Sequence, residues 1–360
     1  MRVALVCPYE LDAPGGVQVH VAELASQLAD RGHDVEVLGP GGGGLGMPVR
    51  VPYRGTVAPI APWPTGVHLA RRAFERFRPD IVHVHEPFTP SSSMWASLAA
   101  TVPVVATFHA WLDRSRIYEY AGRFLAPVRQ RLAATIAVSQ AAADFVGKAV
   151  PGLDPVVIPN GLSVARFAEA PPLAWPPGRR IVWVHRLDRQ KGFPVLVGAF
   201  RSLGEGRGDV WLTVGGDGDD RGAIDGLPPP LRPRVMMLGR LEHAQVPALL
   251  AGADVAVAAA TGQESFGYSV VEAMAAGVPM VASDIEGYRQ VATDGVDALL
   301  VEPGDPKALA AGIGRVLDDS KLAERLSAAG RRRAASFDWS IVVERIESVY
   351  RSVLARPSLR

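Results

Sequence analysis

Cysteine is almost absent from this sequence, which holds one among 360 residues. That residue, Cys7, cannot form an internal disulfide, and its place after the apolar residues 3–6 indicates a buried thiol. The eight histidines are scattered and have no cysteine partners, so no stretch shows the ligand spacing of a metal site. The sequence therefore predicts neither a disulfide scaffold nor a bound metal.

Long hydrophobic runs are also absent. The first apolar run stops at Pro8, Tyr9 and Glu10, which is typical of a buried strand and not of a secretion signal. No window reaches the roughly 18 uninterrupted apolar residues of a membrane span. We therefore expect a cytoplasmic protein, either free or peripheral on the inner face of the plasma membrane.

The sequence has almost no net charge, because it contains 38 basic and 37 acidic side chains. A nucleic-acid-binding protein is expected to be basic overall, so this balance argues against a nucleic-acid partner.

Short, continuously apolar runs alternate with amphipathic stretches along the whole chain. Such runs are typical of parallel strands covered by helices on both faces. The expected strands are residues 3–7, 34–39, 80–85, 102–109, 135–139, 154–161, 180–186, 209–216, 234–240, 254–260, 278–284 and 297–303. Because the chain is long for one core, the pattern predicts an α/β fold of two Rossmann-like, doubly wound domains facing a central cleft.

A proline-rich segment separates the two series of strands. Residues 166–180 carry four prolines and no usable period, which indicates a linker and a hinge. We expect one domain at residues 1–168 and a second at residues 169–339. A final helix at residues 340–360 is expected to pack back on the first domain.

The strongest candidate site follows an expected strand, where Glu264, Ser265, Phe266 and Gly267 open a helix that carries Glu272. The glycine allows backbone amides to approach a phosphate at the helix N-terminus, where the dipole favours anions. The first glutamate can reach a sugar hydroxyl, and the second can accept hydrogen bonds from ribose hydroxyls. The alternative for either glutamate alone is an ordinary helix acid without a ligand.

Two cations form a second cluster, Arg186 at the end of an expected strand and Lys191 before Gly192. Cations aimed at a departing nucleotide diphosphate would stabilise the transition state without a metal. Arginine can hold two phosphate oxygens, and lysine acts as a point charge. The alternative is a pair of surface cations in a polar loop.

A diglycine, Gly15-Gly16, stands between Pro14 and Val17 after the first strand. Its amides can close over a phosphate or a sugar ring, and the alternative is merely a tight turn. Because no G-x-G-x-x-G follows this strand, a dinucleotide-binding fold is disfavoured.

Histidines end two further strands. His109 either positions a sugar or is an ordinary histidine at a sheet edge. His83 and His85 alternate on one strand, and at least one is expected to pack in the wall. Glu86 follows without an assigned role.

Taken together, these motifs resemble the GT-B retaining glycosyltransferases of family four. The resemblance spans nearly the whole chain, includes Ile158-Pro159-Asn160-Gly161 and Phe337-Asp338-Trp339, and keeps the motifs in the family's order. It implies a hexosyltransferase whose donor substrate is a nucleotide diphosphate sugar, with no metal or other cofactor. It further implies that the first domain binds the acceptor and the second the donor. A narrower resemblance is to members of this family that move mannose from GDP-mannose to the inositol ring of phosphatidylinositol, and it is carried by residues 7–9, 14–18, 84–87, 107–109 and 262–264.

The resemblance also implies roles for individual residues. The residues to which it assigns donor binding are Gly15, Gly16, Arg186, Lys191, Glu264, Ser265, Phe266, Gly267 and Glu272. In catalysis it implies His109, Arg186, Lys191 and Glu264. Near the acceptor it implies Tyr9 and Gln18.

The sequence departs from the family's pattern on the acceptor side. A Thr/Ser-rich, lysine-bearing stretch is replaced by residues 110–114, where Arg114 takes the place of the lysine as a phosphate ligand. Phe88 stands where a polar residue is expected. One alternative is therefore the same donor chemistry, from a UDP- or GDP-sugar, with a small soluble acceptor such as a specialised metabolite or an inositol phosphate. Another is a sugar-nucleotide-binding protein without transfer, which donor turnover would rule out.

Residues 67–78 read as a basic amphipathic helix. Its cations are Arg71, Arg72, Arg76 and Arg78, and an apolar stripe lies opposite. Such a helix can lie on an anionic membrane surface and bring the first domain to a lipid acceptor. The alternative is an ordinary sheet-covering helix with solvated arginines.

Overall fold

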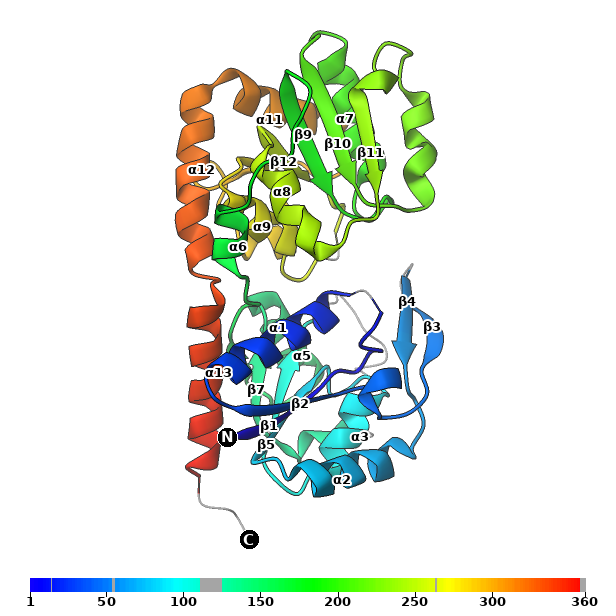
Figure 1. The fold of residues 1–360 in the computed structure, drawn as a ribbon, viewed down its shortest axis with the longest axis vertical. Coiled ribbons are helices and arrows are strands. Elements are labelled where there is room, and N and C mark those ends of the chain that lie inside the picture. Colours follow the sequence, from blue (N-terminus) through cyan, green and yellow to red (C-terminus); the bar gives the residue numbers. More distant parts are fainter. Residues whose placement is uncertain (14, 54–55, 111–124, 263, 357–360) are drawn as a thin grey trace. The chain divides into compact units, whose positions relative to one another are not determined.

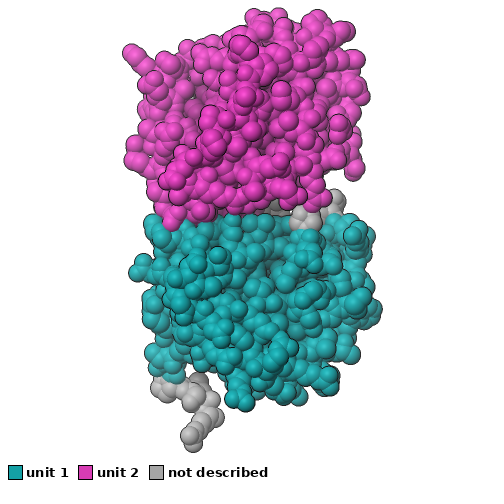
Figure 2. Space-filling view, viewed as in Figure 1, with its two compact units in different colours: residues 1–161, 339–360 teal, residues 162–338 magenta. Residues whose placement is uncertain are grey.

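The computed structural model describes residues 1–13, 15–53, 56–110, 125–262 and 264–356. The chain divides into two compact units, coloured separately in Figure 2. Unit 1 comprises Met1–Gly161 and Trp339–Arg360, and unit 2 comprises Leu162–Asp338.

Unit 1 is built on a six-stranded parallel sheet in the order β2-β1-β5-β6-β7-β8 (Figure 1). Its strands are β1 Arg2–Val6, β2 Asp34–Leu38, β5 Ile81–His85, β6 Val104–Phe108, β7 Leu132–Ala137 and β8 Val156–Val157. Its helices include α1 Gly16–Asp30, α2 Gly66–Phe77, α3 Ser92–Ala99, α5 Gln140–Ala149 and α13 Trp339–Leu354. A separate antiparallel hairpin is formed by β3 Val49–Tyr53 and β4 Thr56–Ile60.

Alternate residues of β1 enter two different cores, because successive side chains of a strand point to opposite faces of the sheet. Val3 and Leu5 pack with α1 and α13. Ala4 and Val6 pack with α2 and α3. This double coverage is the physical reason for the continuous apolar runs in the sequence.

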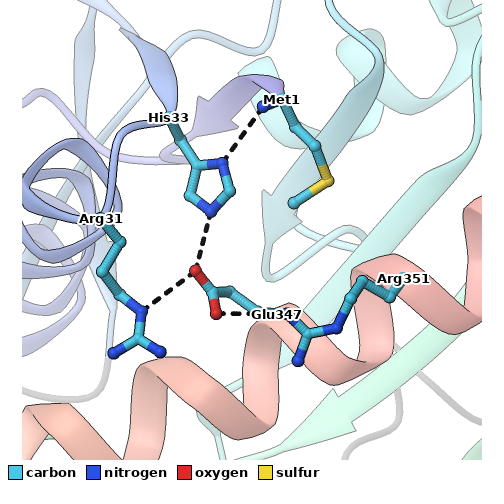
Figure 3. A network of polar contacts seen from close by, with 5 residues as sticks. All are labelled: Met1, Arg31, His33, Glu347 and Arg351. Carbon is cyan, nitrogen blue, oxygen red and sulfur yellow. Dashed lines mark hydrogen bonds and ion pairs between the residues drawn. The ribbon is translucent and has the colours of Figure 1, made fainter.

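The helix α13, drawn in red in Figure 1, is held on unit 1 by a polar network (Figure 3). The Glu347 carboxylate lies 2.8 Å from His33 Nε2, 3.1 Å from Arg31 Nε and 3.4 Å from Arg351 Nη1. The other ring nitrogen of His33 lies 3.2 Å from the amino group of Met1. The last helix of the chain is thus tied to the first helix and the first strand.

Unit 2 has a second six-stranded parallel sheet in the order β11-β10-β9-β12-β13-β14. Its strands are β9 Arg179–Val184, β10 Val210–Gly215, β11 Val235–Gly239, β12 Val255–Ala258, β13 Met280–Ser283 and β14 Leu299–Val301. Its helices include α6 Val164–Ala168, α7 Phe193–Gly204, α8 Val246–Ala251, α9 Tyr268–Ala276, α10 Glu286–Arg289, α11 Pro306–Asp318 and α12 Ser320–Ala335. The order reverses between β9 and β12, as in doubly wound folds.

The predicted fold class is confirmed, because each expected apolar run contains or overlaps a strand of one of two parallel, helix-covered sheets. The β3–β4 hairpin was not predicted. Arg50, Pro52 and Pro59 interrupt its apolar pattern, so neither strand stands out in the sequence.

The proline-rich residues 166–180 differ from the expected linker. They lie within unit 2, where Phe167 on α6 is buried in the core. The chain passes between the units at Gly161–Leu162 and again at Asp338–Trp339. These passages are adjacent, because the Leu162 N–H donates to the Phe337 carbonyl at 2.8 Å.

None of the described helices combines the length and the apolar content that crossing a membrane requires.

Candidate active site

The charged residues predicted in the second half of the chain follow β9 and β12, the two central strands of unit 2. Strand order reverses between these strands, so the loops after them leave the sheet toward opposite sides. The crevice formed in this way is where doubly wound sheets bind ligands. Arg186 and Lys191 come from the loop after β9, and Glu264 comes from the loop after β12.

Four side chains form an alternating chain of charge at this place. Arg186 Nη2 lies 3.1 Å from Asp188 Oδ2. Asp188 Oδ1 accepts a hydrogen bond from the backbone N–H of Lys191 at 2.7 Å. Lys191 Nζ lies 2.5 Å from Glu264 Oε2. Each cation is therefore balanced by a carboxylate that an incoming anion could displace.

Gly192 allows the two loops to meet. Its φ is 80°, and a Cβ at this position would lie 1.8 Å from the carbonyl oxygen of Ala259. Thr261 N–H donates to the Gln190 carbonyl at 3.0 Å and ties the same loops together. This close backbone approach keeps Lys191 beside the loop after β12.

Two helices begin at the site with a glycine N-cap. Gly267 precedes α9 with a φ of 84°, and Gly192 precedes α7. The two glycines have no side chain with which to cap their helices, whereas Asp305 and Asp319 cap α11 and α12. The N-terminus of α9 is suited to binding an anion, whereas α7 begins with the Phe193 N–H bonded to the Asp188 carbonyl and with Pro194, which has no N–H.

The residues around Gly267 do not all face solvent. Phe266 is buried, and its ring packs against Phe337, so its side chain belongs to the core and only its backbone is available to a ligand. Ser265 is partly exposed. Glu272 is buried on α9, with Oε1 2.9 Å from His243 Nε2. This contact fixes the glutamate's orientation.

A hollow of about 730 Å³ opens beside the two loops. Arg189 lines it from the loop after β9, and Thr261 lines it from the loop after β12. None of Arg186, Lys191 and Glu264 lines this open hollow, which therefore lies beside the charged cluster and does not contain it.

His185, next to Arg186, adds no positive charge to the site. Burial, together with the charge of Lys191, lowers the pKa of His185 to about 3.

In unit 1 the predicted residues lie after β1, β5 and β6. Gly15 is the N-cap of α1, and the Cβ position of Gly16 faces open space. The side chain of Gln18 is buried and folds back over Gly15, where a Cβ would lie 2.3 Å from its Oε1. Tyr9 forms an isolated backbone bridge with Ile60 of the hairpin. The structure thus brings Gln18 to the diglycine turn.

His109 follows β6 and is buried among three other histidines. His85 Nδ1 lies 2.9 Å from His109 Nε2, and the ring of His20 lies 4.9 Å from that of His109 between centroids. His83 stacks on His85 at 4.5 Å. Burial is the main cause that lowers the pKa of each ring, to about 3 for His20 and His83, so all four are neutral near pH 7.

Glu86 and Asp188 are site candidates that the sequence left without a role. Glu86 is buried, has a φ of 50° and accepts hydrogen bonds from the backbone N–H groups of His109 and Ala110 at 2.5 and 2.7 Å. A positive φ is uncommon for a residue with a side chain and often marks a functional position. The sequence gives two indications of a role for these acids. Both follow strands, and Asp188 also stands between the two cations.

The structure of α2 contradicts the expectation that its apolar stripe can lie on a membrane surface. Ala70 and Phe74 of its apolar stripe are buried against the sheet and α3, so this stripe is not available to a lipid surface. Its cations are all exposed: Arg71, Arg72, Arg76 and Arg78. Arg76 pairs with Glu36, and Arg78 is the C-cap residue. A membrane could therefore meet the arginines of α2 but not its apolar face.

Two further observations on the acceptor side concern Phe88 and Arg114. Phe88 is buried, and its ring packs against Phe108 at 5.5 Å, so it is a core residue. Arg114, predicted as an acceptor contact, lies outside the described residues, as do Pro14 and Trp111.

Two doubly wound units are the fold of GT-B glycosyltransferases, which similar solved structures share. The profile described as Glycosyltransferase Family 4 matches residues 14–166, and that of Glycosyl transferases group 1 matches residues 169–333. The chain belongs to glycosyltransferase family 4 and is a hexosyltransferase.

A full-length relative is the phosphatidyl-myo-inositol mannosyltransferase of Mycobacterium leprae. It is 38% identical, over 98% of this chain and 97% of its own length. Among solved structures, a sucrose-phosphate synthase from Thermosynechococcus elongatus matches with a TM-score of 0.78 at 21% identity, covering 98% of this chain and 99% of its own. Anabaena HepE in complex with UDP matches with a TM-score of 0.75 at 20% identity, covering 98% and 100%. These structures share the fold.

Proposed function

We propose that this enzyme transfers mannose from GDP-mannose to the inositol ring of a phosphatidylinositol lipid, with retention of anomeric configuration. The name of the Mycobacterium leprae relative supports the sugar and the acceptor. We assign acceptor binding to unit 1 and donor binding to unit 2.

The observation that carries the proposal is the alternating charge of Arg186, Asp188, Lys191 and Glu264. An incoming diphosphate competes with Asp188 for Arg186 and with Glu264 for Lys191. As the bond to the sugar breaks, negative charge grows on the leaving diphosphate. Preorganised cations and helix amides stabilise that charge more in the transition state than in the ground state.

Displacement of Lys191 frees the Glu264 carboxylate to accept hydrogen bonds from sugar hydroxyls. The amides from Ser265 to Gly267 contribute at the N-terminus of α9, and Glu272, oriented by His243, binds the ribose. Donor contacts from unit 1 are the amides of Gly15 and Gly16.

The retaining step is a same-face displacement. The inositol hydroxyl attacks the anomeric carbon from the side on which the diphosphate departs, so one C–O bond forms as the sugar–phosphate bond breaks. A leaving phosphate oxygen takes the hydroxyl proton. Neutral His109 contacts the transferred sugar, while Tyr9 and Gln18 lie on the acceptor side.

A lipid acceptor requires contact with a membrane surface, which we assign to the arginines of α2. Arg71 and Arg78 line a hollow of about 320 Å³ together with Glu75 and with apolar side chains that include Phe74 and Val102. Exposed arginines attract anionic lipid headgroups, each contributing about 1 kcal/mol.

The test is transfer by the full chain from radiolabelled GDP-mannose, UDP-glucose or UDP-N-acetylglucosamine, with and without phosphatidylinositol vesicles. We expect labelled lipid from GDP-mannose alone, and an α-linked product by NMR. Label on a soluble acceptor without vesicles would favour the small-acceptor alternative. Donor that is neither transferred nor hydrolysed would contradict enzymatic transfer altogether.

Lys191→Ala provides the residue-level test. Loss of one preorganised charge at a developing anion lowers kcat by about 100- to 1000-fold. Arg201→Ala is the matched control, because Arg201 is an exposed cation of unit 2 that also pairs with a glutamate, Glu205. Equal losses in both variants would contradict a specific role for Lys191.

A further inference from the structure

Three histidines far apart in the sequence meet in the interior of unit 1. His20 comes from α1, His85 ends β5, and His109 follows β6. One ring nitrogen from each lies within 4.8 Å of the other two. Histidine is a preferred ligand of zinc and of other late first-row dications.

The ring nitrogens of this cluster have few partners. No described residue offers a hydrogen bond to either nitrogen of His20 or to Nε2 of His85, although both rings are buried. His85 Nδ1 and His109 Nε2 share one proton in a hydrogen bond of 2.9 Å, and His109 also has a side-chain hydrogen bond to Asn160. Each neutral imidazole offers a lone pair on one nitrogen, and the hydrogen bond between His85 and His109 already uses one of the three, so coordination by all three rings must break that bond.

We propose that His20, His85 and His109 bind a transition-metal dication such as zinc. The metal would take no part in the transfer reaction.

The surroundings of the cluster fit a metal site. Glu86 is buried and bonded to the backbone N–H of His109, which places a carboxylate next to the cluster to offset part of a dication's charge. His83 is not a ligand. Its Nδ1 lies 2.6 Å from Tyr350 Oη and its Nε2 2.7 Å from Thr107 Oγ1, so both nitrogens are occupied.

The distances require only small ring movements. Zinc–nitrogen bonds of about 2.0–2.1 Å put the nitrogens of a tetrahedral site about 3.4 Å apart. The 4.8 Å limit exceeds this by at most about 1.4 Å, and closing the difference also requires the hydrogen bond between His85 and His109 to break. His109, at 8% exposure, is the ligand that reaches the surface, and a water can take the fourth position.

The proposed metal site does not depend on the proposed function, but the expected effect of the metal on transfer does. If His109 contacts the transferred sugar, a metal that holds its ring inhibits transfer. Binding is therefore measured on the chain without donor, and transfer is a separate arm. Metal binding by a protein without mannosyl transfer would overturn the proposed function and leave the site intact.

The experiment is calorimetric titration of the chelator-treated full chain with ZnCl₂, supported by the visible spectrum of bound Co²⁺. We expect one tight site per chain, the absorption of tetrahedral Co²⁺, and a higher melting temperature with zinc. His20→Gln, His85→Gln and His109→Gln should each weaken binding by at least about 100-fold. His68→Gln removes an exposed histidine of α2 and should change nothing.

Circular dichroism and metal-free melting curves establish which variants are folded, and three independent ligand variants keep the test open if one is not. Unchanged zinc affinity in any folded ligand variant would overturn the three-histidine site. So would an equal loss in His68→Gln, because binding would then belong to surface histidines.

Discussion

Gly192 shows how one residue without a side chain sets the position of a charged one. The loop after β9 can approach the carbonyl of Ala259 only because no Cβ intervenes, and this approach keeps Lys191 within 2.5 Å of Glu264. The positive φ of Gly192 adds a second reason, since other residues adopt that conformation at a cost.

We predict that Gly192→Ala lowers the free energy of unfolding by roughly 1–3 kcal/mol and weakens GDP binding. Urea denaturation and calorimetry measure the two effects. Gly206→Ala is the control, because nothing lies within 4 Å of its Cβ position. Equal effects in both variants would show that the loss reflects the added methyl group in general and not the loop contact.

A second prediction at this scale concerns the Lys191–Glu264 pair. Glu264→Gln removes the carboxylate that competes with a diphosphate for Lys191. GDP should therefore bind roughly two- to fivefold more tightly, which corresponds to a partly exposed ion pair, while transfer decreases because a sugar contact is weakened. Glu205→Gln, at an exposed ion pair elsewhere in unit 2, serves as the control. Weaker GDP binding in Glu264→Gln would rule out this competition.

At the scale of elements, α13 depends on the buried Glu347. Burial alone would raise the pKa of its carboxyl, but hydrogen bonds and charge from His33 and Arg31 lower it below its usual range. A carboxyl whose folded-state pKa is lowered stabilises the fold above its unfolded-state pKa. That contribution disappears as the pH falls through the folded-state value.

We predict that Glu347→Gln lowers the free energy of unfolding by about 1–3 kcal/mol at pH 7. The difference from the unmodified protein should shrink as the pH falls below the usual range of a glutamate. Urea titrations at several pH values measure it. Glu344→Gln alters an exposed glutamate of the same helix and should have little effect at any pH. A difference that stays constant down to low pH would contradict the linkage.

At the scale of the whole molecule, the exposed arginines of α2 determine how the protein would bind an anionic membrane surface. Arg71 and Arg72 are neighbouring exposed cations on a helix whose apolar stripe is already in the core. Attraction to such a surface would therefore be mainly electrostatic and sensitive to salt.

We predict that replacing both Arg71 and Arg72 by Gln weakens binding to phosphatidylinositol vesicles by about 30-fold, from about 1 kcal/mol per charge. Co-sedimentation with vesicles at low and high salt measures this. The matched control replaces Arg331 and Arg332, two neighbouring exposed arginines of α12 in unit 2. Vesicle binding that does not respond to salt would contradict the electrostatic attachment.

The sequence by itself determined the parts of this protein that local patterns encode. Runs such as residues 3–7 are apolar at every position because their strands are covered on both faces, and this alone predicts two parallel sheets. Arg186 and Glu264 stand at strand ends, and parallel strands bring such ends together.

Only the tertiary structure decided which residues meet. Lys191 and Glu264 are 73 positions apart, and their contact depends on the backbone approach at Gly192. Periodicity showed the apolar stripe of α2 but not that it faces the core, and spacing gave no sign that His20 and His109 converge. The physical reason is that residue patterns report each segment's own conformation, whereas partners distant in the sequence are set by how the segments pack.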